Sequence, residues 1–127
     1  MHALKSAALA AVIAIAATLA AFAHAKMVAS VPEDGATVAS GLSQIALLFS
    51  KPLRLTLVRV HRGTDDKNIP LASALPTAFA ASAKVTVAAL PEGDYDVSWI
   101  AVAEDGHVMK GSFAFTVAAT HEPAPAQ

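Results

Sequence analysis

The hydrophobic residues of this chain recur with a period of two, and this pattern constrains the fold more strongly than any other feature. In the segment 94–103, DYDVSWIAVA, every second side chain from Tyr95 to Ala101 is apolar. Successive side chains of a strand point to opposite faces of a sheet, so such alternation is typical of a half-buried strand. Comparable segments, rich in β-branched and aromatic residues, lie at 27–31, 44–50, 55–61, 84–90 and 111–118.

Turn sequences separate these segments. Asp105-Gly106 and the run from Pro91 to Asp94 are combinations typical of tight turns. Pro52 follows the segment 44–50 and is predicted to end that strand, because proline cannot donate to a ladder. The segment 72–83 is interrupted by a proline and is predicted to be a loop or a short strand. About seven short strands with frequent turns predict an antiparallel β-sandwich with Greek-key connections.

The segment 55–61, LTLVRVH, also predicts which side chains share a face. Strict alternation places Thr56, Val58 and Val60 on one side of the strand. Leu55 and Leu57 then lie on the opposite side, together with the charged or polar residues at 59 and 61.

Residues 1–23 are predicted to be a secretory signal peptide. Lys5 precedes an uncharged, alanine-rich stretch, and the small-x-small pattern at 21–23 ends directly before His24. A second such pattern, at 23–25, would place the cut before Lys26 and discard the histidine. A retained membrane anchor is the remaining alternative for this stretch. Cleavage before His24 would export the protein and make His24 its first residue.

Composition limits what the exported chain can be. It is predicted to form one small domain at 24–118, followed by a Pro/Ala-rich tail at 119–127 that is predicted to be disordered. The chain has no cysteine, so neither disulfides nor thiolate metal sites are available to it. Its formal net charge is −1, which lacks the basic excess of nucleic-acid-binding proteins.

Asp105-Gly106-His107 is the motif best suited to metal binding. An Asp and a His two positions apart can project from the same side of an extended segment, and Gly106 restricts the backbone little. If His24 is the mature N-terminus, its α-amine and Nδ1 can close a six-membered chelate ring around a metal. The amine suits this role because its ordinary pKa is only about 7.7–8.0. Together these groups would offer nitrogen and oxygen donors of the kind that suit Cu(II).

The motif also has an ordinary explanation. Asp-Gly is among the commonest turn dipeptides, and the histidine after it can be a plain exposed turn residue. His61 is predicted to be a solvated edge residue, while His2 in the signal and His121 in the tail are predicted to play no part.

Several segments spread along the chain resemble the CopC family of periplasmic copper-binding proteins. They are His24-Ala25 at the expected mature start, SVPEDGATV at 30–38, LLFS at 47–50, YDVSW at 95–99, DGH at 105–107 and GSFAFTV at 111–117. The resemblance implies an immunoglobulin-like Greek-key β-sandwich/barrel. It also implies one Cu(II) site per chain, with His24, Asp105 and His107 as its ligands, which are the same three residues that the chelate argument selects.

Two departures from the family pattern concern the metal site. Some relatives have a methionine-rich loop for Cu(I), whereas only Met27 and Met109 follow the predicted signal here. We therefore expect no Cu(I) methionine site. Relatives often have an acidic residue after the Phe-Ser of the second strand, where this chain has Lys51. A cation close to Cu(II) would disfavour the metal.

The sequence therefore predicts a periplasmic, monomeric, non-enzymatic copper carrier or buffer, acting in copper homeostasis or resistance. Its partners would be the copper ion and an inner-membrane copper transporter, with no role for nucleic acid. One alternative is a secreted β-sandwich that binds a protein partner, with the motif at 105–107 serving as a hairpin turn. Another is an oxidative enzyme that holds copper in a histidine brace at its N-terminus.

Overall fold

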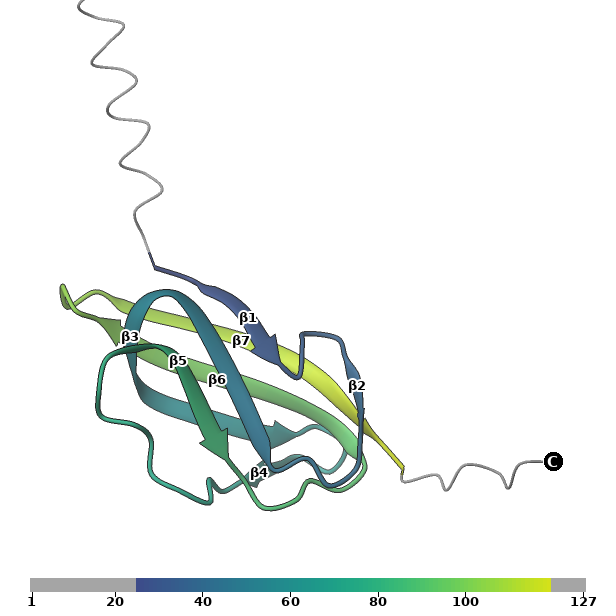
Figure 1. Ribbon diagram of the computed structural model, residues 1–127. Coiled ribbons are helices and arrows are strands. Elements are labelled where there is room, and N and C mark those ends of the chain that lie inside the picture. The colour runs from purple at the N-terminus through teal and green to yellow at the C-terminus, as the bar shows by residue number, and fades with distance from the viewer. Residues whose placement is uncertain (1–24, 120–127) are drawn as a thin grey trace, which may run out of the picture.

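The computed structural model describes residues 25–119, and within them the chain forms strands and no helix. No helix in this part of the chain is long and apolar enough to cross a membrane. The predicted signal peptide, residue His24 and nearly all of the predicted tail lie outside the described residues. The strands are β1 Met27–Val31, β2 Thr37–Ala39, β3 Gln44–Arg62, β4 Lys67–Ile69, β5 Ala80–Thr86, β6 Gly93–Ala103 and β7 Val108–Ala118 (Figure 1).

These strands form one strongly curled sheet whose two layers enclose the core. The first half of β3 pairs with β1 on one side and with β5 on the other, whereas its second half pairs with β4 and β6. β7 continues the second layer by pairing antiparallel with β6, and β2 joins β7 in parallel. The predicted all-β, immunoglobulin-like Greek-key sandwich of about seven strands is therefore confirmed.

The long strand β3 replaces the two separate strands predicted at 44–50 and 55–61. The prediction that Pro52 ends the first strand was wrong, because β3 continues through it. The ladder partners of β3 change across Lys51 and Pro52, from β1 and β5 to β6. A proline is tolerated at such a corner, where the strand passes from one layer to the other and no ladder bond is lost.

A β-bulge at Thr56 overturns the predicted faces of this strand. Leu55 pairs with Ala101 and Leu57 pairs with Ile100, so β3 contains one more residue than β6 at this point. The extra residue reverses the alternation. Leu55 is consequently only 5% exposed in the core, whereas Leu57 is 41% exposed on the outer face.

The other strands differ from the prediction mainly in their ends. β1 has the predicted bounds, and β6 begins one residue before its predicted start. β7 begins at Val108, three residues early, and β5 begins at Ala80, inside the segment predicted to be a loop or short strand. The strands β2 and β4 were not predicted, because three residues are too few to show a period.

The core contains the aromatic residues of β3, β6 and β7. Phe49 and Trp99 meet edge to face with ring centroids 5.3 Å apart, and Tyr95 stacks on Phe115 at 5.5 Å. Trp99 lies so close to Gly111 that a Cβ at this glycine would stand 2.7 Å from the indole ring. The core residues are Ile45, Leu47, Phe49, Leu53, Leu55, Val58, Val60, Val85, Val87, Leu90, Tyr95, Val97, Trp99, Ala101, Phe113, Phe115 and Val117.

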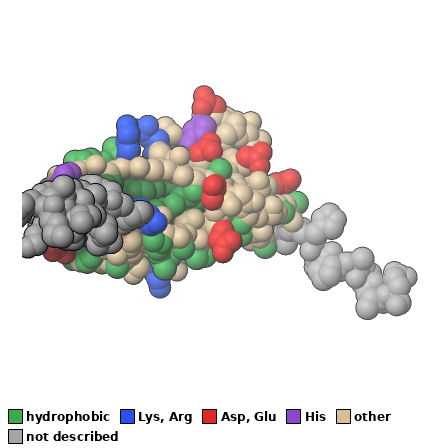
Figure 2. Space-filling model, turned by 90° about the horizontal axis from the view of Figure 1, so that it is seen from above, with side chains coloured by type: hydrophobic (Ala, Val, Ile, Leu, Met, Phe, Trp, Pro, Cys, Tyr) green, Lys and Arg blue, Asp and Glu red, His purple; other side chains and the backbone are tan. Residues whose placement is uncertain are grey.

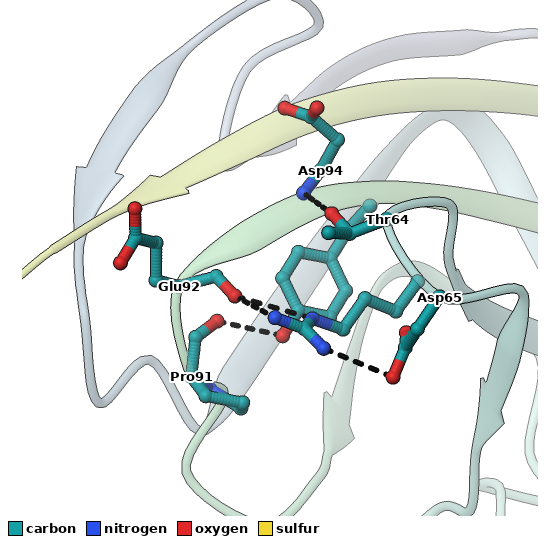
Figure 3. A network of polar contacts seen from close by, with 7 residues as sticks. Thr64, Asp65, Pro91, Glu92 and Asp94 are labelled. Atoms are coloured by element: carbon teal, nitrogen blue, oxygen red, sulfur yellow. Dashed lines mark hydrogen bonds and ion pairs between the residues drawn. The ribbon is translucent and has the colours of Figure 1, made fainter.

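Acidic side chains gather at the end of the fold where β7 finishes, as the face drawn in Figure 2 shows. Polar contacts hold the loops together there (Figure 3). The Arg62 guanidinium donates to the Glu92 carbonyl and pairs with Asp65 at 3.0 Å. The buried Tyr95 hydroxyl donates to the Pro91 carbonyl at 2.7 Å, four residues upstream. This tyrosine corner is a hallmark of Greek-key sandwiches.

Candidate metal centre

The motif Asp105-Gly106-His107 forms the tight turn between β6 and β7. The Gly106 N–H donates to the Ala103 carbonyl at 2.9 Å, and the Ala103 N–H donates to the His107 carbonyl at 2.8 Å. Gly106 has φ +89°, a conformation that residues with a Cβ rarely adopt. The Asp-Gly pair therefore forms the turn that the sequence predicted, at the end of the fold opposite the acidic end.

Asp105 holds His107 through both of its carboxylate oxygens. Oδ1 accepts the backbone N–H of His107 at 3.1 Å, and Oδ2 lies 2.8 Å from Nδ1 of its imidazole. These contacts, led by the backbone N–H, hold the pKa of the Asp105 carboxyl below its usual range. This carboxylate, paired to Nδ1, fixes the orientation of the ring in the metal-free protein.

A cleft of about 250 Å³ opens beside this turn. It is bounded by the corner of β3 and by the β6–β7 turn, and it also contains Ala25, the first described residue. The side chains of Asp105 and His107 therefore line the same space as Ala25, the residue that follows His24. The cleft is lined by Ala25, Lys51, Pro52, Ala103, Glu104, Asp105, His107 and Met109.

Ser50 anchors the start of the chain to this cleft. The Lys26 N–H donates to Ser50 Oγ at 3.0 Å, and the Ser50 N–H donates to the Lys26 carbonyl at 2.8 Å. These two bonds hold the backbone of Lys26 against Ser50 of β3, and Lys26 is two residues after His24 in the sequence. The sequence indicates no such role for Ser50, which stands in the LLFS segment, since the contact joins residues 24 positions apart.

The described residues supply two of the three predicted ligands. Asp105 and His107 meet at the cleft, whereas His24 lies outside the described residues. Within residues 25–119 no group of three or more His, Asp or Glu side chains is placed to hold a metal. An ion held by both residues would take the place of the proton between Asp105 Oδ2 and His107 Nδ1, because Nε2 points away from this carboxylate. The donor types present fit a divalent metal with mixed nitrogen and oxygen ligands.

Lys51 and Met109 also line the cleft. Lys51 is the residue that replaces the acidic side chain expected from the family pattern, and the corner of β3 brings it to the same space as Asp105 and His107. The cleft thus combines one cation with the carboxylates of Glu104 and Asp105.

His61 lies at the other end of the ladder between β3 and β6. It pairs with Asp96, whereas the cleft end of the same ladder pairs Leu53 with Ala103. Eight residues of strand correspond to roughly 26 Å. His61 is not simply solvated as expected, because Nε2 lies 2.8 Å from Asp66 and Nδ1 lies 3.6 Å from Asp96. The contact with Asp66 is the main cause that raises the pKa of this imidazole.

Comparison with known proteins identifies the family of this chain and several of its relatives. A family model described as the CopC domain matches residues 27–118. The chain belongs to the CopC family. Two relatives are named copper resistance protein C. The one from Xanthomonas campestris pv. juglandis is 37% identical over 117 residues, covering 84% of this chain and 91% of its own. The one from Escherichia coli is 30% identical over 106 residues, covering 76% and 83%.

Solved structures of CopC-family proteins have the same fold. CopC from Methylosinus trichosporium OB3b matches with a TM-score of 0.64 at 19% identity, covering 80% of this chain and all of that one. PcoC from Escherichia coli, described as a methionine-rich copper resistance protein, matches with a TM-score of 0.60 at 31% identity. That match covers 75% of this chain and 99% of PcoC.

Proposed function

We propose that this CopC-family chain binds one Cu(II) ion and acts as a periplasmic copper carrier or buffer in copper resistance. The observation that supports this most directly is the cleft, which gathers Asp105, His107 and the residue next to His24. The relatives named copper resistance protein C support the same biological role.

The proposed ligands are the α-amine and imidazole of His24, the His107 imidazole and an Asp105 oxygen. The first two form a chelate that exists only if the chain is cut before His24. Cu(II) favours such a set, since it heads the affinity order of divalent ions and accepts square-planar nitrogen and oxygen donors. Asp105 would orient the His107 ring in the metal-free protein and donate to the ion once copper is bound.

The proposal includes several finer points. The protein acts without catalysis, as a monomer, and passes copper to an inner-membrane transporter. Its site is specific for Cu(II), with no separate Cu(I) methionine site, since the whole chain contains three methionines. The Asp105 carboxylate supports a carrier or buffer of Cu(II) over an oxidative enzyme, because a hard anionic oxygen ligand favours Cu(II) over Cu(I).

A titration with Cu(II) tests this function on two forms of the chain, one beginning at His24 and one beginning at Lys26. We expect one tight copper per chain for the first form and a loss of affinity of more than about a thousandfold for the second. Circular dichroism of both apo forms provides the control for folding. Equal affinities would show that the α-amine and imidazole of His24 take no part.

A further inference from the structure

A shallow trough of about 540 Å³ lies on the outer face of β3, β6 and β7, separate from the cleft. Cross-strand register explains its shape. Leu57, Ile100 and Lys110 form one row across the three strands, and a second row is formed by residues 59, 98 and 112. Small side chains in the second row, Ser98 and Ser112, leave the surface hollow there.

The bulge at Thr56 creates the apolar part of this trough. Without the extra residue, the alternation of the strand would continue past Leu55, and Leu57 would point into the core as Leu55 does. The bulge instead directs Leu57 to the outer face beside Ile100. Bulges commonly re-aim a side chain next to a functional site, so this exposed leucine has a structural cause.

The charges of the trough are of one sign. Arg59 and Lys110 line it, and no carboxylate does. Within residues 25–119 neither side chain makes a hydrogen bond, an ion pair or a ring contact. Arg54, on the same strand, differs because its guanidinium lies 5.2 Å from the centre of the Phe79 ring. The trough therefore presents two unpaired cations on either side of an apolar strip.

The trough lies close to the cleft along β6. Ile100 lines the trough and Ala103 lines the cleft, which places them roughly 10 Å apart on one strand. On β7, the neighbours Met109 and Lys110 line the cleft and the trough respectively. Met109 and Lys110 point to opposite faces of β7, so the trough and the cleft open on different sides of the sheet.

We propose that this trough docks an extended acidic segment of a partner protein. Apolar side chains of that segment would cover Leu57 and Ile100, and its carboxylates would pair with Arg59 and Lys110. Charge complementarity supports this occupant, as does the hollow shape, which accepts protruding side chains better than a flat lipid surface. The proposal concerns the surface alone and holds whether or not the cleft binds copper.

The test uses a blocked peptide of alternating aspartate and leucine, titrated into ¹⁵N-labelled apo protein. We expect weak, saturable binding that shifts the amide signals of β6 and β7 around residues 98–100 and 110–112. Fluorescence of Trp99, the single tryptophan of the chain, gives a second readout because this buried residue lies between the trough residues Ser98 and Ile100 on β6. Added salt should weaken binding, since it depends on exposed charges.

Charge reversal identifies the site. The double variant Arg59→Glu/Lys110→Glu should lose about tenfold or more in peptide affinity, whereas the matched variant Lys67→Glu/Lys84→Glu, on β4 and β5, should bind like the original protein. Equal binding by both variants, or no shift at the trough, would overturn the proposal. So would binding to phosphatidylglycerol vesicles in place of the peptide, or self-association of the protein through this face.

Discussion

The two ends of the β3–β6 ladder each carry a histidine paired with an aspartate, yet only one end is the proposed metal site. At both ends the closest nitrogen–oxygen distance is 2.8 Å. His107 pairs with Asp105 through Nδ1 within one turn, beside a cleft that also contains Ala25. His61 has a carboxylate near each ring nitrogen, from Asp66 and from Asp96.

This difference separates the histidine that we propose as a metal ligand from one held by charge pairing. The Asp105 carboxylate on Nδ1 orients the His107 ring at the edge of the cleft. Carboxylates at both nitrogens instead favour the doubly protonated imidazolium, which cannot bind a metal. The contact between histidine and aspartate is therefore not diagnostic by itself. The cleft beside the β6–β7 turn, with Ala25 in its lining, distinguishes the two ends.

The largest effect should follow from adding one glycine before His24. This change keeps every side chain of the cleft but moves the free amine away from the imidazole of residue 24. We expect Cu(II) affinity to fall by about a thousandfold, because a chelate ring is lost. Isothermal titration measures the change. Unaltered affinity would mean that the free α-amine of His24 does not bind the copper. The proposed difference between the His107 end and the His61 end would then be unsupported.

The next effect compares the two histidines directly. His107→Ala should weaken Cu(II) binding by about a hundredfold, because it removes a nitrogen donor. Asp105→Ala should weaken it less, since water can partly replace an oxygen ligand. His61→Ala is the matched control at the other end and should leave affinity unchanged. Equal losses from His61→Ala and His107→Ala in competition titrations would contradict the assignment.

Lys51 allows the charge of the cleft to be changed without altering a ligand. Lys51→Glu places a carboxylate where CopC-family relatives often have one and should tighten Cu(II) binding about tenfold. Raising the salt concentration should reduce this gain. Lys67→Glu, at the acidic end, makes the same change of charge far from the cleft. If the two substitutions tighten binding equally, only the net charge of the protein matters.

The smallest effect concerns stability at the His61 end. The folded state raises the pKa of His61 above its usual value near 6.5. Its pairing therefore stabilises the fold fully below that value, and the contribution disappears as the pH rises through the folded pKa. His61→Gln should lower the urea midpoint at pH 5.5 and leave it almost unchanged at pH 8.5. A difference that grows with pH would show that charge pairing is not what holds His61.

The sequence predicted the local features of this molecule better than the distant ones. The period of two located β1 and β6 closely, and Asp105-Gly106 predicted the turn that presents the candidate ligands. The bulge at Thr56 was not predictable, because one inserted residue has no signature in composition. The anchoring of Lys26 by Ser50 was missed for another reason, since it depends on tertiary packing.

Electron paramagnetic resonance of the one-to-one Cu(II) complex, prepared from protein that begins at His24, tests the central claim most directly. The account predicts a tetragonal Cu(II) signal with hyperfine structure from three nitrogens, and His107→Ala should remove one of them while His61→Ala removes none. Identical spectra for the original protein and His107→Ala would contradict the claim that the cleft end is the copper site.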